Sequence, residues 1–405
     1  MKKILIILIA VISIAIIAFL GWYFILRDSS IPVGATLRNV LPFGSGDNTP
    51  QSTTNNPQPT TDIGDQQTMT TSNMFHISDI PVAGAVVFEK EDQTVVRYVD
   101  RATGHIYEAD LKTLAKTKIT NQTLPKIYEA YFRADGNAVL LRSLKDNSDV
   151  VENLSLALTP PQGTSTDALY AVSSTALRGD ISAVAVGSGN ALFYALRDTT
   201  SIITSAFNGA SARTIFTAPF TDWRLAAAGN SLVVYTKASV NIPGYAYTLN
   251  ISNGAFTKIL GPLNGLIVIP NTAGNRVLYS YVEDNKAKLF AKNLTNNTFS
   301  EILPVTLAEK CVWSIRKTGI LFCAAPVDAP GVGEPDNWYR GATHFSDRIW
   351  LFDINTDIAQ VLIEPNQSLG IDIDMVEPKL SSNEDYLVFI NKTDLSLWAL
   401  RLEAF

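Results

Sequence analysis

The sequence has few of the side chains that build metal and redox centres, since its 405 residues include only two cysteines and three histidines. Zinc and iron–sulfur sites take several soft ligands at fixed spacings, and this chain has too few of them. An excess of basic residues is also missing, because 32 Lys and Arg stand against 38 Asp and Glu, for a net charge of −6. The chain therefore lacks the electrostatic footprint of a nucleic-acid-binding protein.

One long apolar run is present, at residues 4–26, with neither a charge nor a proline. As a helix it would measure about 34 Å, enough to cross a hydrocarbon core of about 30 Å. Lys2 and Lys3 precede the run, and Trp22 and Tyr23 lie near its far end, where aromatic rings favour the membrane interface. We expect an uncleaved, single-pass signal anchor, with residues 1–3 in the cytoplasm and the remainder outside the cell membrane. A cleaved signal peptide and a buried core helix are the alternatives; the run is long for the former and lacks its small-residue cleavage site.

A polar stretch follows the apolar run. Residues 44–73 are rich in Thr, Asn, Gln and Pro, and only Ile63 and Met69 among them are sizeable apolar side chains. Such a composition buries too little surface to offset its chain entropy, so we expect residues 27–74 to be a disordered linker. As a flexible coil this linker would reach about 35–40 Å.

Residues 75–405 contain short β-branched and aromatic runs broken by Gly, Asn, Asp and Pro, which is typical of an all-β domain. A tight turn followed by an apolar strand recurs seven times along this part of the chain. The copies begin at residues 91, 134, 187, 227, 272, 316 and 382, and read EDQTVVRYV, ADGNAVLLRS, GSGNALFYAL, AAGNSLVVYT, TAGNRVLYSY, RKTGILFCA and SNEDYLVFI.

A second unit, a strand, a turn and another strand, follows several of these copies, for example at residues 105–120, 245–260, 288–303 and 348–363. Four short strands in about 45 residues are the blade of a β-propeller, so the repeat predicts a seven-bladed ring. The last blade ends after its third strand. We therefore expect Phe75–Asp79 to supply its missing outer strand, which would join the termini and remove an exposed sheet edge.

By this repeat, residues 75–405 resemble the WD40-like and TolB-like propellers. The turn FRADGNAVLL (132–141) is similar to their strand turn, although WD dipeptides are absent. The runs CVWSIRKTGILFCAAP, PDNWYRG and FSDRIW also look like membrane-anchored bacterial propeller proteins of uncharacterised function. The resemblance implies a fold and a compartment but no activity, because propellers host many unrelated functions.

The longest interruption of the repeat, residues 325–347, falls between the second and third strands of the sixth blade. Segments of this length within a compact repeat are often functional. In the resembling propellers, this connection lies on the face that usually binds partners. Aromatic and Arg side chains make good interface anchors, so the candidate binding residues are Asp336, Trp338, Tyr339, Arg340 and His344. The alternative is that Trp338 and Tyr339 fold back to plug the tunnel or cover the blade.

Carboxylates concentrate near the same segment, at Asp336, Asp347, Asp372, Asp374 and Glu377. The alternation in IDIDM (371–375) predicts that Asp372 and Asp374 share one strand face, which we interpret as solvated. A glycosidase requires two carboxyl groups across one bond, and a calcium site requires several oxygens on one loop. No G-x-S-x-G motif, calcium-loop motif or i, i+4 histidine pair occurs. We therefore expect no catalytic residue, metal or cofactor.

The two cysteines, Cys311 and Cys323, each lie six residues from Lys317 in a predicted hairpin. That symmetry would place their side chains opposite each other on neighbouring strands, and export would favour a disulfide. Two buried thiols are the alternative.

These patterns favour a membrane-anchored propeller outside the cytoplasm that binds a protein or glycan at the cell envelope, and we do not expect it to be an enzyme. The alternative function is a carbohydrate-active or metal-dependent enzyme with carboxylates at the propeller tunnel. An accessory subunit of an envelope machine is a third possibility.

Overall fold

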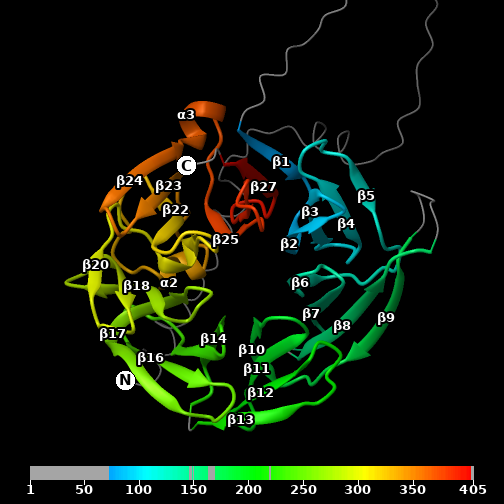
Figure 1. Ribbon diagram of the computed structural model, residues 1–405, viewed down its shortest axis with the longest axis horizontal. Helices are drawn as coiled ribbons and strands as arrows, with labels where there is room; N and C mark the ends of the chain where they lie inside the picture. Colours follow the sequence, from blue (N-terminus) through cyan, green and yellow to red (C-terminus); the bar gives the residue numbers. More distant parts are fainter. Residues whose placement is uncertain (1–72, 146–147, 149, 163–168, 219, 403–405) are drawn as a thin grey trace, which may run out of the picture. The chain divides into compact units, whose positions relative to one another are not determined.

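The computed structural model describes residues 73–402, except for 146–147, 149, 163–168 and 219. The predicted membrane span and nearly all of the predicted linker lie outside the described residues. Within these residues, the chain forms six antiparallel sheets that follow one another around a ring (Figure 1). The all-β prediction is confirmed. No helix in the described part of the chain is long and apolar enough to cross a membrane.

Four of the sheets are built from four strands each, consecutive along the chain. The first contains β2 (Val82–Lys90), β3 (Gln93–Asp100), β4 (Ile106–Asp110) and β5 (Lys116–Lys118), and the second β6 (Ile127–Phe132), β7 (Ala138–Leu144), β8 (Val151–Thr159) and β9 (Ala171–Ala176). The third contains β10 (Ile181–Val186), β11 (Ala191–Leu196), β12 (Ser201–Ala206) and β13 (Arg213–Thr217). Further along the chain, the fourth contains β21 (Cys311–Trp313), β22 (Ile320–Pro326), β23 (Asp347–Asp353) and β24 (Ile358–Ile363).

The seven-stranded sheet connects through one long strand, β17 (Phe256–Pro270). The first part of β17 pairs with β16, and the part from Asn264 onward pairs with β18. The other strands of this sheet are β14 (Trp223–Ala228), β15 (Ser231–Thr236), β16 (Pro243–Asn250), β18 (Arg276–Glu283), β19 (Lys286–Asn293) and β20 (Phe299–Glu301). Short helices η1 (Ala308–Lys310), α2 (Asp336–Tyr339) and α3 (Pro365–Leu369) lie in connections.

The tight turn recognised in the sequence joins the first and second strands of each repeat. Gly136, Gly189, Gly229, Gly274 and Gly319 all have positive φ there, a conformation that glycine adopts without a steric penalty. The turn therefore requires a positive φ, which glycine adopts most easily; in the two copies without glycine, Asp92 and Glu384 adopt it instead.

Apolar cores lie between neighbouring sheets. One core combines Val86 of β2 and Val95 of β3 with Ala130 of β6 and Val139 of β7. At Gly84, a Cβ atom would stand 2.1 Å from the carbonyl oxygen of Ala130, so the first strands of two sheets approach too closely for any side chain there. Strands covered on both faces read as unbroken apolar runs, as β22 does with all seven residues buried.

The last sheet is closed by the N-terminal strand, β1 (Met74–Ser78). It contains β25 (Met375–Leu380), β26 (Tyr386–Asn391) and β27 (Leu397–Arg401), and β1 pairs with β27 as its fourth strand. The predicted closure is confirmed, although the strand begins at Met74, a residue that the sequence prediction placed in the linker. Met74 and Ile77 are 2% and 1% exposed. Closure therefore adds apolar burial as well as backbone pairing.

Deleting residues 74–78 should lower the melting temperature far more than deleting residues 54–58, a control of equal length within the predicted linker. Burial of Met74 and Ile77 alone contributes about 1.5–3 kcal/mol each. Thermal unfolding of the two variants measures the difference. Equal melting temperatures would show that β1 does not hold the ring closed.

Candidate functional site

The segment between β22 and β23, residues 327–346, contains α2 and crosses to another sheet. The carboxylate of Asp336 accepts hydrogen bonds from Ser239 Oγ (3.1 Å) and from the backbone N–H of Val240 (2.6 Å), both in the connection between β15 and β16. Asp336 therefore ties the segment to the neighbouring structure. Its place in the predicted binding set stays a prediction.

Trp338 points inward from α2. Its side chain is 2% exposed, and its indole N–H donates to Asp374 Oδ1 and Oδ2 at 3.0 and 2.9 Å. The backbone N–H of Phe345 donates to the same carboxylate at 3.2 Å. This arrangement is the folded-back alternative. It corrects the prediction for Trp338, because a side chain so deeply buried does not offer a partner an anchor.

A buried ion cluster holds this arrangement in place. Lys310, the last residue of η1, pairs with Asp374 and, at 2.8 Å, with Asp347 Oδ2, and all three side chains are 0% exposed. Asp347 Oδ2 also accepts the backbone N–H of Met375. Burial raises the pKa of Asp347 to about 6, against the opposing effect of Lys310. A buried charge without a partner would cost stability, so Lys310, Asp347 and Asp374 hold one another in position.

The remaining predicted binding residues, Tyr339, Arg340 and His344, are exposed. The Tyr339 hydroxyl donates to Glu309, and Arg340 donates to the side-chain oxygen of Asn337 at 2.6 Å. The structure thus places three of the five predicted residues on the surface. Their role in binding stays a prediction.

The interpretation of Asp372 and Asp374 as one solvated strand face is wrong. Residues 371–374 precede β25 and are not part of a strand. Asp372 is exposed and accepts hydrogen bonds from Ser346 and Asn366, which lower its pKa. Asp374 is 0% exposed and faces Lys310. The carboxylates that do converge, Asp347 and Asp374, are thus closed to solvent and leave no room for a sugar between them. In the described ranges, no three ligand-type side chains are placed to hold a metal ion.

Glu309 was missed by sequence reasoning. It precedes Lys310, and burial raises the pKa of its carboxyl despite the hydrogen bond from Tyr339. The sequence signal for this site was a pair of charged residues, Glu309 and Lys310, directly before the apolar strand CVW. Charged side chains beside a buried strand usually have partners.

Several connections gather on one side of the ring, which we call the loop face. It carries the connections between second and third strands and those between consecutive sheets. One groove on this face has a volume of about 530 Å³. It is lined by the connections before β14 and after β15 and by the segment between β22 and β23. The lining includes Phe220, Asp222, Lys237, Ile242 and Asp336.

Exposed apolar side chains concentrate on the loop face. Fourteen large hydrophobic residues among those described are exposed. Nine of them lie on the loop face, eight in its connections and Leu144 at the end of β7 that enters one: Ile80, Leu144, Val150, Phe220, Ile242, Leu303, Val327, Val332 and Tyr339. The opposite face has three, Leu114, Leu169 and Ile315. Phe220 and Ile242 also line the groove beside Asp336, and exposed apolar side chains that gather at a groove are typical of an interaction surface.

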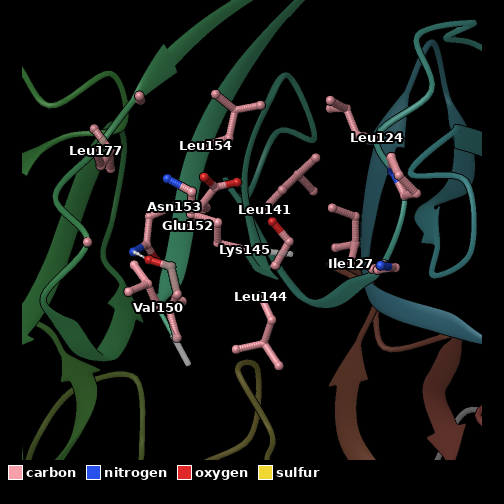
Figure 2. A pocket seen from close by; sticks show the side chains of 16 residues that line it. Leu124, Ile127, Leu141, Leu144, Lys145, Val150, Glu152, Asn153, Leu154 and Leu177 are labelled. Atoms are coloured by element: carbon pink, nitrogen blue, oxygen red, sulfur yellow. Dashed lines mark hydrogen bonds between the residues drawn. The ribbon is translucent and has the colours of Figure 1, made fainter. Parts of the chain in front are cut away.

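A second loop-face groove, of about 510 Å³, lies beside β7 and β8. Figure 2 shows Leu124 and Ile127 on one side of it and Leu177 on the other. Its lining also includes Leu141, Leu144 and Leu154. The polar members are Lys126, Ser143, Lys145, Glu152 and Asn153. Its lining is chiefly aliphatic.

Cys311 and Cys323 are opposite each other in β21 and β22, the register that their spacing suggests, and they are joined as a disulfide. Both are buried. The bond lies next to Lys310 and so braces the strand that follows the ion cluster.

Comparison with known proteins supports the fold and no more. No family model and no curated protein matches the chain. Among solved structures, the chain is similar to a chain of hydrazine synthase from Kuenenia stuttgartiensis, with 12% identity and a TM-score of 0.50 over 80% of this chain and 97% of that one.

Two further structures are similar at lower scores. They are U3-55K (12% identity, TM-score 0.49, 81% of this chain and 98% of that one) and TolB from Acinetobacter baumannii (10% identity, TM-score 0.41, 77% of this chain). The match spans 64% of the TolB chain. The antiparallel sheets arranged in a ring form a β-propeller, as the resemblance implied, and the likeness to the hydrazine synthase chain concerns the fold alone.

Thiol titration of the denatured, unreduced full chain should find no free thiol, because the chain's only two cysteines are paired. Reduction before titration should then release two. Two free thiols without reduction would contradict the disulfide. Replacing both cysteines by alanine should lower stability by about 2–3 kcal/mol, since the closed loop is short.

Proposed function

We propose that this protein is a binding module of the cell envelope: a seven-bladed propeller, anchored by residues 4–26, that holds a protein partner on its loop face. The blade count treats the seven-stranded sheet as two blades that share β17. The observation that carries the proposal is the concentration of exposed apolar side chains on the loop face.

The rigidity of the loop face supports this function. Its longest segment is fixed by Asp336, Trp338 and the Lys310 cluster. A preorganised surface loses little conformational freedom on binding. The chemistry of the surface favours a protein over a glycan, because seven of its nine exposed apolar residues are aliphatic and only Phe220 and Tyr339 carry the aromatic rings on which sugars stack.

The enzyme alternative has less support. The pair of carboxyl groups that a glycosidase places on either side of its substrate must be open to that substrate. Asp347 and Asp374 are both 0% exposed.

Substituting Phe220, Ile242 and Val332 together by serine should abolish capture of the partner when full-length chains are cross-linked in native envelopes. Three exposed contacts of about 1 kcal/mol each correspond to about a hundredfold loss of affinity. The fold should be unaffected, because all three side chains are more than half exposed.

The matched control substitutes Leu114, Leu169 and Ile315 on the opposite face by serine, and it should capture the partner as the wild type does. Equal capture by the loop-face variant, or loss only in the control, would overturn the proposal. Protease digestion of the purified cross-linked complex should yield peptides of a second protein; a complex that yields peptides of this chain alone would identify the partner as a glycan.

The proposed location has its own test. Protease added to intact cells should release a soluble propeller by cutting within residues 44–73, because the linker and the propeller would both face outward. Release that requires prior lysis would reverse the proposed orientation.

A further inference from the structure

Lys310, Asp347 and Asp374 bring an amine and two carboxyl groups into contact in a place that solvent does not reach. Lys310 Nζ lies 2.8 Å from Asp347 Oδ2 and is paired with Asp374 Oδ1, and each side chain is 0% exposed. Lys310 belongs to η1, Asp374 precedes β25 of the next sheet, and Asp347 begins β23. Three separate parts of the chain therefore supply the cluster.

The surroundings of the cluster are aromatic. Lys310 Nζ lies 5.2 Å from the ring centroid of Trp338 and 5.0 Å from that of Phe345. One ammonium and two carboxylates would leave an excess negative charge, and Asp347 Oδ1 has no hydrogen-bond partner among the described residues. An apolar enclosure favours neutral forms of amines and acids over charged ones. The site thus suits chemistry that removes charge.

We propose that Lys310 and Asp374 become joined by an isopeptide bond between Lys310 Nζ and Asp374 Cγ, with Asp347 acting as the general acid–base. The assignment rests on contact, enclosure and the position of the third carboxyl group. It concerns the scaffold and does not depend on the proposed partner.

The reaction is a condensation that needs no co-reactant. Asp347 takes a proton from the Lys310 ammonium, and the freed lone pair attacks Cγ of Asp374 to form the new C–N bond. Asp347 passes this proton to an oxygen of Asp374, takes a second proton from the nitrogen of the tetrahedral intermediate and delivers it to the same oxygen, so that the C–O bond breaks and one water leaves. An ammonium and a carboxylate thus become a neutral amide and water, and Asp347 ends in its starting state.

Neighbouring donors are placed to assist the attack. The Trp338 indole N–H and the Phe345 backbone N–H both point at the Asp374 carboxylate. Donors fixed in this way stabilise the negative oxygen of a tetrahedral intermediate. The product also replaces two buried charges, which are costly to keep from water, by a neutral group. Trp338, expected from sequence to bind a partner, acts here as a positioning residue.

Mass spectrometry of the reduced, denatured full chain tests the bond. The mass should be about 18 Da below that of the sequence, the loss of one water. A tryptic digest should contain a branched peptide that joins the regions of Lys310 and Asp374, with no cleavage after Lys310. Full mass, or a linkage at other residues, would overturn the proposal.

Variants assign the roles. Lys310→Arg and Asp347→Asn should both retain the full mass, the first because it lacks the amine and the second because it lacks the proton carrier. Lys392→Arg is the matched control. Lys392 Nζ lies 5.0 Å from the centroid of the same Trp338 ring, but the proposed reaction does not use its amine. This variant should therefore still lose one water. If a substituted chain fails to fold, the wild-type digest alone decides whether the bond exists. A branched peptide in Lys310→Arg would refute the assignment.

Discussion

The buried pairing of Lys310 with Asp374 is the interaction on which the candidate binding face most depends. It joins two neighbouring sheets and gives the indole of Trp338 its acceptor. A charge in such a place is tolerated only when it is fully paired, so the cluster fixes its members in one arrangement. Loss of one partner would leave the others buried and unsatisfied.

The sheets of the ring depend on one another in the same way as the members of the buried cluster. Each sheet is covered on both sides by its neighbours, so none could keep its apolar faces from water alone. The contact between β1 and β27 brings the two ends of the described chain into one sheet. With the ring closed, its connections can be irregular and exposed, and the loop face has this character.

Sequence reasoning predicted the repeat, the turns and the closing strand because each depends on local pattern. Glycine at the tight turn and apolar runs in covered strands are visible without tertiary information. The orientation of Trp338 was not predictable in this way. The local sequence around Trp338 would be the same whether its side chain were exposed or buried. Its orientation depends on its hydrogen-bond acceptor, Asp374, which lies 36 residues further along the chain. The prediction from IDIDM (371–375) was wrong for a related reason. Alternation of apolar and acidic residues predicts a strand face, but the position of Asp374 is decided by its pairing with Lys310, a buried residue of another segment.

Residues 334–346 should behave as a fixed part of the propeller. Hydrogen exchange followed by mass spectrometry measures this directly in the full chain. We expect the amides of Trp338, Arg340 and Phe345, which donate to Glu334, Asp336 and Asp374, to be protected to an extent comparable with β22 and β23. Exchange of these amides as fast as that of an unstructured loop would show that the segment is not fixed.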